Sequence, residues 1–197
     1  MKSSSFVVPD ELDVLERHPK TSEPGELMRP HNMTCFGCGP ESPHGLHLEM
    51  YAGEGFSVDA KMPVQQWMEG GPGVIHGGIL SSAFDDVMGM TPRLIGPAAV
   101  TAHLQVDFLQ PIPVGKTLHL HAEILGKQRR KIYVEGVAHL GDPERPVARA
   151  NGLFVQIDVR AHFADHVENS AKAAEYLAVS LSSEVGSERR VHRVGVA

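Results

Sequence analysis

The residues best suited to do chemistry lie in one stretch, residues 73–90, which begins with a turn and continues as a helical pattern. His76 precedes the glycine pair Gly77 and Gly78, and Asp85 follows two helical turns later. Glycines at a helix start leave backbone N–H groups without an intrahelical acceptor. The helix dipole makes these groups good donors to a carbonyl oxygen or an anion. A carboxylate within reach of an acyl group bound there could act as general base for a water or attack directly.

The helix expected after His76 has an apolar face and a face of small residues. Apolar residues recur at spacings of three and four, as a helix packed on a core requires: Leu80, Ala83, Phe84, Val87 and Met88. The other stripe consists of Gly78, Ser82, Asp85 and Gly89. A carboxylate among small residues suits a helix that a ligand approaches. The alternative is that Asp85 and its neighbour Asp86 are simply solvated. At about 100° per residue these two carboxylates cannot share one face.

Length and charge limit the classes of function. A chain of 197 residues is expected to form one domain with appendages, and its formal net charge of −6 argues against a nucleic-acid-binding face. No apolar run is long enough for a transmembrane helix, and the apolar run near the N-terminus is too short for a signal peptide. Two cysteines do not make a disulfide framework. The cytoplasm is therefore the expected compartment, with no nucleic-acid or membrane partner.

The pattern along the chain predicts an α+β domain between two appendages. Residues 1–30 are expected to form an arm that is packed on the outside or partly disordered, with a short helix at 10–17. Residues 31–160 are expected to form the domain, with an antiparallel sheet wrapped on the one helix. Residues 161–197 are expected to add a helix at 164–181 and a tail. Alternation of polar and apolar residues predicts the strands at 46–51, 56–62, 100–109, 118–124, 132–140 and 147–158.

Cys35 and Cys38 form a C-x-x-C pair, with His31, His44 and His47 nearby. Thiolates and imidazoles at short spacing suit the tetrahedral preference of zinc, but a single C-x-x-C without a second pair is a weak metal signature. Buried structural thiols are therefore the favoured interpretation, ahead of a zinc site and of a redox-active pair. No metal ligand is assigned from the sequence. A metal-dependent enzyme is the least favoured class, because these residues are distant in sequence from the acid of the helix.

Three runs of this sequence together resemble one known family. They are Cys35-Phe-Gly-Cys-Gly, Pro43-His-Gly-Leu and Pro72-Gly-Val-Ile-His-Gly-Gly78, the last with Asp85 nine residues past its histidine. Over residues 31–158 the chain resembles the PaaI-like hotdog-fold acyl-CoA thioesterases. The resemblance implies a five- or six-stranded antiparallel sheet around the central helix, and homodimers or dimers of dimers with active sites at the subunit interface. It also implies hydrolysis of an acyl-coenzyme A thioester, with no cofactor beyond the CoA of the substrate.

Carried over by position, the resemblance gives several residues a role. The Gly77 amide would polarise the thioester carbonyl, Asp85 would be the nucleophile or general base, and His76 would begin the helix beside the thioester. Thr101 matches a strand hydroxyl that helps to position water in some members. The residues expected to contact the substrate are Gly78, Ser82, Trp67 and Met88. The cations expected to hold the CoA phosphates, unless their turn is simply a solvated basic surface, are Arg129, Arg130 and Lys131.

One position departs from the family pattern. Several relatives have Asn or Gln six residues before the histidine, where this chain has Gly70. Another group must then supply the water contact, or turnover is slow. A non-catalytic acyl-CoA-binding hotdog protein is therefore the alternative function. A hotdog enoyl-CoA hydratase is less favoured, because it needs an Asp-x-x-x-x-His pattern and no histidine lies within ten residues after Asp85.

Overall fold

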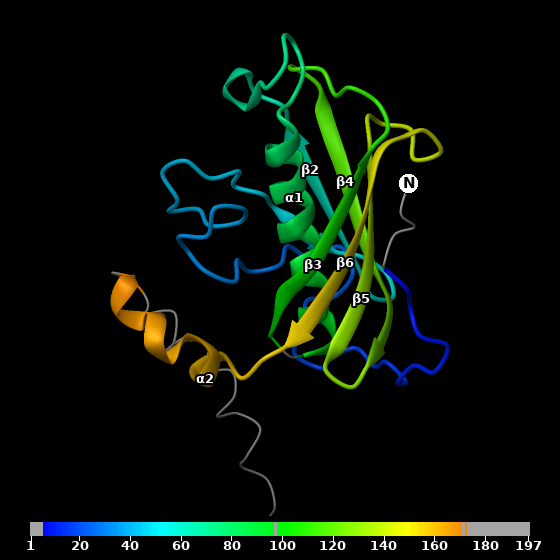
Figure 1. The fold of residues 1–197 in the computed structure, drawn as a ribbon, viewed down its shortest axis with the longest axis vertical. Helices are drawn as coiled ribbons and strands as arrows, with labels where there is room; N and C mark the ends of the chain where they lie inside the picture. The colour runs from blue at the N-terminus through cyan, green and yellow to red at the C-terminus, as the bar shows by residue number, and fades with distance from the viewer. Residues whose placement is uncertain (1–5, 97, 171, 173–197) are drawn as a thin grey trace, which may run out of the picture. The chain divides into compact units, whose positions relative to one another are not determined.

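The structure, a computed structural model, describes residues 6–96, 98–170 and 172 (Figure 1). The elements in chain order are β1 (Met50–Ala52), β2 (Ser57–Pro63), η1 (Gln66–Met68), α1 (Gly77–Met90), η2 (Thr91–Ile95), β3 (Ala99–Phe108), β4 (Thr117–Gln128), β5 (Lys131–His139), β6 (Pro146–Gln156), α2 (Val159–Phe163) and η3 (Ala164–Asn169). The η elements are short 3-10 helices. The central helix and every predicted strand are present, with ends within a few residues of the predicted ones.

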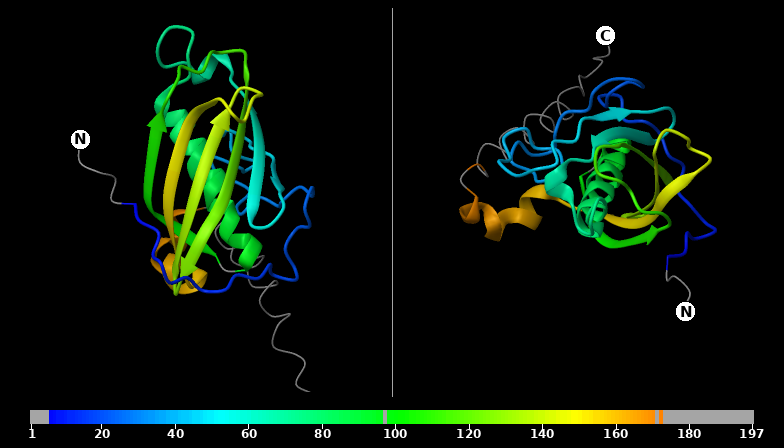
Figure 2. Two further views of the ribbon diagram at one scale, coloured as in Figure 1. Left: turned by 90° about the vertical axis from the view of Figure 1, so that its right-hand side faces the viewer. Right: turned by 90° about the horizontal axis from the view of Figure 1, so that it is seen from above.

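The strands form one antiparallel sheet in the order β1-β2-β4-β5-β6-β3, and this sheet wraps around α1 (Figure 2). The helix buries the apolar face predicted from its spacing, since these residues are at most 1% exposed: Leu80, Ala83, Phe84, Val87 and Met88. Alternate residues of β4 point into the same core: Leu118, Leu120, Ala122 and Ile124. The α+β fold with a sheet wrapped on a central helix is confirmed.

Glycines of the sheet let α1 lie close to it. A Cβ atom at Gly136 of β5 would lie 2.9 Å from Phe84 Cδ1, and one at Gly152 of β6 would lie 2.8 Å from Met88 Cε. Met88 is therefore held in the core beneath the sheet, with none of its surface exposed. The sequence analysis expected Met88 to contact the substrate. The structure places it in the core instead, because it belongs to the apolar stripe of α1 that faces the sheet.

Residues 6–30 form an extended arm along the domain, and the short helix expected at 10–17 is absent. Asp13 N donates to Lys127 O at 2.8 Å, and Arg17 donates to the carbonyl oxygens of Gly53 and Gly55. Leu15 packs against the core. Backbone groups that bond to the domain are not available for helical hydrogen bonds, so these contacts favour the extended conformation.

The contacts divide the chain between Ile157 and Asp158, and the arm belongs to the first unit. The second unit begins with α2, which Asp158 caps by accepting a hydrogen bond from Ala161 N. Of the helix predicted at 164–181, residues 164–169 form a 3-10 helix, and most of the remainder lies outside the described residues. No helix in the described part of the chain is long and apolar enough to cross a membrane.

Candidate active site

The first turn of α1 presents one unbonded backbone donor. His76 caps the helix, because its Nδ1 accepts the Gly78 N–H at 2.9 Å and its own N–H donates to Met68 O at 2.7 Å. The Gly77 N–H belongs to the first helical residue and has no acceptor among the described residues. The structure therefore leaves at Gly77 the free donor that the sequence analysis expected.

The loop before the helix leaves no room for a side chain at position 70. A Cβ atom at Gly70 would lie 2.7 Å from His76 Cα and 3.0 Å from His76 Cβ. The Glu69 carboxylate holds this loop, since it accepts from Gly73 N at 2.5 Å and from Gln66 Nε2 at 2.8 Å. The glycine that departs from the family pattern thus follows from close packing of the loop against the helix cap.

A cleft of about 300 Å³ opens beside the start of α1. Its walls come from the helix start, the end of β3 and the connection that follows: Val74, Ile75, Gly77, Leu80, Phe108, Leu109, Gln110, Pro111 and Ile112. The Phe108 ring lies so close that a Cβ atom at Gly77 would be 3.3 Å from Phe108 Cε1. A mainly apolar cleft with a backbone donor on its wall suits an apolar group that carries a carbonyl.

Asp85 lies further along the same helix and bonds to β3. Thr101 Oγ1 donates to Asp85 Oδ1 at 2.7 Å, with Thr101 exposed and Asp85 half-buried. The pairing of β3 with β6 shifts register between Thr101 and His103. Such bulges are frequent at sheet edges and next to functional sites, where they re-aim a side chain. The structure thus brings together the two residues that the resemblance assigns as the acid and the strand hydroxyl.

The Gly77 amide and the Asp85 carboxylate lie on different turns of α1. At a rise of about 1.5 Å per residue they are about 12 Å apart along the helix axis. One thioester carbonyl therefore cannot contact both groups of the same chain. β3, which carries Thr101, is an edge strand that pairs only with β6 in the part of the chain that the structure describes. An edge strand of this length offers unpaired backbone groups to another strand.

Two further residues expected at the substrate have polar partners of their own. Ser82 Oγ donates to Gly78 O at 2.9 Å within the helix. The Trp67 indole N–H donates to Gln65 Oε1 at 2.7 Å, and the residue is 52% exposed. Neither contact excludes the substrate, so the roles of Gly78, Ser82 and Trp67 stay predictions.

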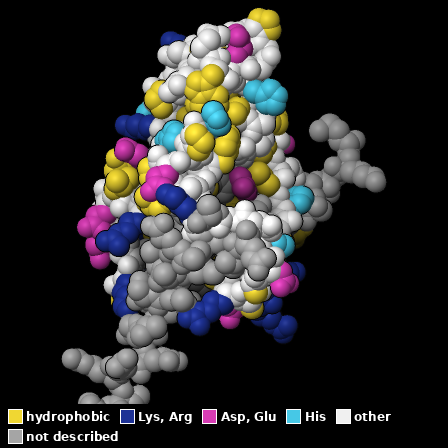
Figure 3. All heavy atoms as spheres, turned by 90° about the vertical axis from the view of Figure 1, so that its left-hand side faces the viewer, with side chains coloured by type: hydrophobic (Ala, Val, Ile, Leu, Met, Phe, Trp, Pro, Cys, Tyr) yellow, Lys and Arg dark blue, Asp and Glu magenta, His cyan; other side chains and the backbone are white. Residues whose placement is uncertain are grey.

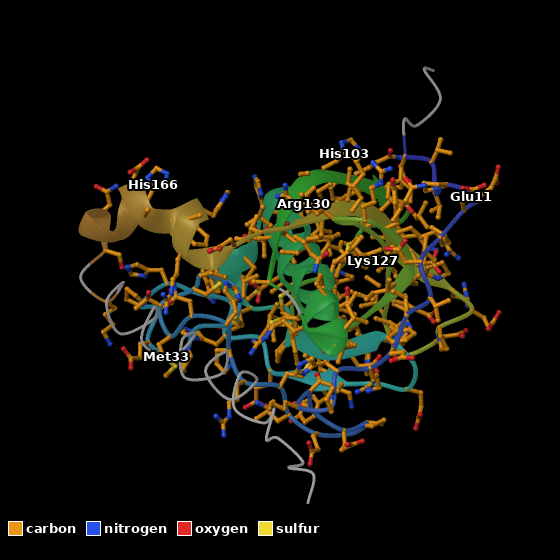
Figure 4. All side chains as sticks on the ribbon, turned by 90° about the horizontal axis from the view of Figure 1, so that it is seen from below. Glu11, Met33, His103, Lys127, Arg130 and His166 are labelled. Carbon is orange, nitrogen blue, oxygen red and sulfur yellow. The ribbon has the colours of Figure 1, made fainter. Side chains whose placement is uncertain are left out.

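The predicted CoA-binding cations, Arg129, Arg130 and Lys131, lie at the turn between β4 and β5 and are exposed (Figure 4 labels Arg130). Arg130 Nε and Nη2 donate to Gln156 O at 2.9 and 2.8 Å. The start of β5 pairs with the end of β6, which in turn pairs with the start of β3. The cationic turn therefore lies at the end of the sheet where Thr101 bonds to Asp85 of α1, and the cleft lies at the other end.

A second group of side chains meets at Asp86, a residue that the sequence analysis did not connect with the C-x-x-C pair. One donor atom from each of His31, Cys35, Cys38 and Asp86 lies within 4.8 Å of the others. Both cysteines are free, and Cys38 is buried. Asp85 faces Thr101, whereas Asp86 faces the C-x-x-C loop. The sequence signalled the C-x-x-C pair and the nearby His31 but not Asp86, which lies 51 residues after Cys35.

Close packing shifts the pKa values of all these groups. Hydrogen bonding with Cys38 lowers the pKa of Cys35 to about 3, and the same contact raises the pKa of Cys38. Burial raises the pKa of Asp86 to about 7, with a further contribution from the charge of Cys35. The hydrogen bond to Cys35 raises the pKa of His31. Negative charge in this group is therefore held most readily by the Cys35 sulfur.

The part of the domain that contains Gly77, Asp85 and Thr101 is similar to known proteins. Residues 72–147, from the loop before α1 to the start of β6, match the family model of the thioesterase superfamily. This part of the domain is similar to that superfamily. Acyl-coenzyme A thioesterase THEM5 of Homo sapiens is 30% identical over 93 residues, which are 47% of this chain and 38% of that protein. Acyl-coenzyme A thioesterase THEM4 of Bos taurus is 26% identical over 92 residues, 47% of this chain and 38% of that protein. The chain thus spans well under half the length of these thioesterase-superfamily relatives.

Solved structures share the fold. A thioesterase superfamily protein of known crystal structure is 27% identical, with a TM-score of 0.56 over 59% of this chain and 60% of that one. The E. coli PaaI protein from the phenylacetic acid degradation operon is 24% identical, with a TM-score of 0.54 over 57% of this chain and 81% of its own. The PaaI-like hotdog fold expected from the sequence is therefore present in this domain.

Proposed function

We propose that this protein hydrolyses an acyl-coenzyme A thioester to the free acid and CoA. The observation that carries the proposal is the unbonded Gly77 amide on the wall of an apolar cleft, on the same helix as the Thr101-bonded Asp85. Two fold neighbours support CoA as the ligand class. The smu.793 protein from Streptococcus mutans is described bound to acetyl CoA, and a hypothetical thioesterase from Streptococcus pneumoniae is described with coenzyme A.

In the proposed reaction, the thioester carbonyl oxygen accepts a hydrogen bond from Gly77 N–H, which stabilises the negative charge that develops there. Asp85 takes a proton from water as the water oxygen bonds to the carbonyl carbon, or Asp85 itself attacks and water then hydrolyses the anhydride. The C–S bond breaks, and the CoA thiolate leaves and takes up a proton. Thr101, by its hydrogen bond to Oδ1, fixes the orientation of the carboxylate.

The reaction requires two copies of the chain, because about 12 Å of helix separates the two groups in one copy. Pairing of β3 edges in a homodimer would bring Gly77 of one copy toward Asp85 of the other. The basic turn at Arg129 and Arg130 would come from the copy that supplies Asp85, where it would meet the CoA phosphates. The proposed assembly is therefore a homodimer or a dimer of dimers. The proposed compartment is a reducing one such as the cytoplasm, which fits two free cysteines.

Thiol release from a panel of acyl-CoA esters, compared between wild type and Asp85→Asn, tests the proposal. We expect hydrolysis by wild type and a loss of about 10²–10⁴-fold in the variant, with an unchanged melting temperature. Equal activity of both proteins would refute the role of Asp85.

Gly70 favours one alternative, a hotdog protein that binds acyl-CoA without hydrolysing it. The position from which relatives orient water has no side chain here and no space for one. Saturable CoA binding with no turnover of any ester would establish this alternative.

A further inference from the structure

The loop of residues 31–38 and helix α1 bring four metal-ligating side chains to one point. Cys38 Sγ lies 3.2 Å from His31 Nδ1, and Cys35 Sγ lies 3.4 Å from Asp86 Oδ1. All four donor atoms lie within 4.8 Å of one another. On the face of the molecule seen in Figure 3, histidine, acidic and hydrophobic side chains lie next to one another. His31 is exposed, so an ion has a path into the group from solvent.

These separations are close to those of a tetrahedral zinc shell. Zinc binds sulfur at about 2.3 Å and nitrogen or oxygen at about 2.0–2.2 Å, so its tetrahedral ligands lie about 3.3–3.8 Å apart. The Cys38–His31 distance of 3.2 Å lies just below this range and the Cys35–Asp86 distance of 3.4 Å lies within it, whereas the widest pair of donor atoms needs to close by about 1 Å. Two sulfurs, one imidazole and one carboxylate form a donor set that suits zinc better than magnesium or calcium.

The packing around Asp86 and Cys35 suits a bound cation. Asp86 Oδ2 is buried and has no hydrogen-bond partner among the described residues, a costly arrangement for a carboxylate oxygen. Gly37 N–H donates to Cys35 Sγ at 3.3 Å, the kind of contact that supports a metal-bound thiolate. A Cβ atom at Gly37 would lie within 2.6 Å of the Asp86 carboxylate atoms, so only glycine lets the loop approach this closely.

We propose that His31, Cys35, Cys38 and Asp86 bind one zinc ion that fastens the loop of residues 31–48 to α1. A pair of buried structural thiols, the interpretation favoured from the sequence, accounts for Cys38 but not for the orphaned oxygen of Asp86. A disulfide between the cysteines would not explain why His31 and Asp86 lie beside them. Four protein ligands leave no open coordination position, so the ion is structural rather than catalytic.

The site adjoins the proposed active site through the chain itself. Asp86 follows Asp85 directly, about 100° further around the helix. The loop is held to the domain by Leu48 N donating to Gly37 O at 2.9 Å and Leu46 N donating to Phe36 O at 2.7 Å. A zinc ion at Asp86 would therefore fix the outer face of α1, while Thr101 fixes the carboxylate on the neighbouring face.

Metal content of the full chain, purified under reducing conditions without chelator, tests this proposal. We expect about one zinc ion per chain by plasma mass spectrometry, and a fall of at least about tenfold in Cys35→Ser and in Asp86→Asn. Asp85→Asn is the matched control, because it makes the same change one residue away and should keep its zinc. Because the Cys35 variant could fail to fold, cobalt(II) replaces zinc in the wild type as a second test. Thiolate-to-cobalt charge transfer and the visible bands of a tetrahedral site are expected.

Three results would overturn the proposal. The first is wild type that carries no zinc after reconstitution and shows no cobalt–thiolate band. The second is folded Asp86→Asn that retains the zinc content of wild type. The third is a Cys35–Cys38 disulfide found in the reduced preparation, which would assign the pair to redox chemistry instead.

Discussion

Thr101→Val tests whether the hydroxyl bonded to Asp85 takes part in catalysis. The change removes one hydroxyl, keeps the side-chain shape and suits a β-strand. A hydrogen bond to a charged group contributes about 1.5–3 kcal/mol, and Thr101 is exposed, so we take the lower end of this range. About 1.5 kcal/mol corresponds to a roughly tenfold loss of kcat. KM should stay within about twofold, because the bond is to the catalytic group rather than to the substrate.

The assay is initial-rate thiol release with the best acyl-CoA ester of the panel, together with a thermal melt. Thr117→Val, at another exposed strand threonine, is the matched control and should leave kcat unchanged. The melting temperature of Thr101→Val should stay near that of wild type, since no core contact is lost. Full activity in Thr101→Val would refute the positioning role. An equal loss in both variants would assign the effect to strand structure.

Three further predictions follow from other contacts. Gly70→Asn should destabilise the fold by about 1–3 kcal/mol in urea unfolding, because its Cβ would press on His76 Cα; an unchanged midpoint would mean that the loop moves freely. The hydrogen bond that His121 Nδ1 donates to Asp59 Oδ1 raises the pKa of His121, so the stability that the pair contributes is present below the unfolded pKa of 6.5 and is lost as pH rises through the folded pKa. Asp59→Asn should then cost at most about 1 kcal/mol near pH 5 and nothing near pH 9, and a cost that grows with pH would contradict this assignment. Arg129→Gln should raise KM for acyl-CoA esters several-fold at low salt and leave kcat unchanged. A KM equal to that of wild type would show that the turn is a solvated basic surface that does not bind CoA.

The fold was predictable because its signals are local. The glycine pair after His76 sets the helix start, and the spacing from Leu80 to Met88 sets its buried face, which the structure shows at those residues. The alternation of polar and apolar residues, which is also a local signal, predicted the strands. The arm was less predictable: residues 10–17 have a helical spacing, but Asp13 bonds to the domain through Lys127 and keeps the chain extended.

The site was predictable only in part, since spacing along the chain does not report proximity in space. The resemblance assigned Thr101 only as a strand hydroxyl that helps to position water, and its 2.7 Å hydrogen bond to Asp85 came from the structure. Met88 was misplaced, because apolar residues near a site give the same pattern whether they line a pocket or fill the core. The sequence showed only that Asp86 cannot share a face with Asp85, because its partner Cys35 lies 51 residues earlier in the chain.

The central claim is that Gly77 and Asp85 serve one thioester site made from two copies of the chain. Gly77→Pro removes the amide proton while suiting the first helical position, and the extended backbone of His76 tolerates a following proline. Gly77→Pro and Asp85→Asn should each be inactive in acyl-CoA hydrolysis, provided that their melts show folded protein. Unfolded, mixed in equal amounts and refolded together, they should recover about a quarter of wild-type activity, because half of the dimers then contain one intact site. A refolded mixture as inactive as its two parents would contradict the shared site.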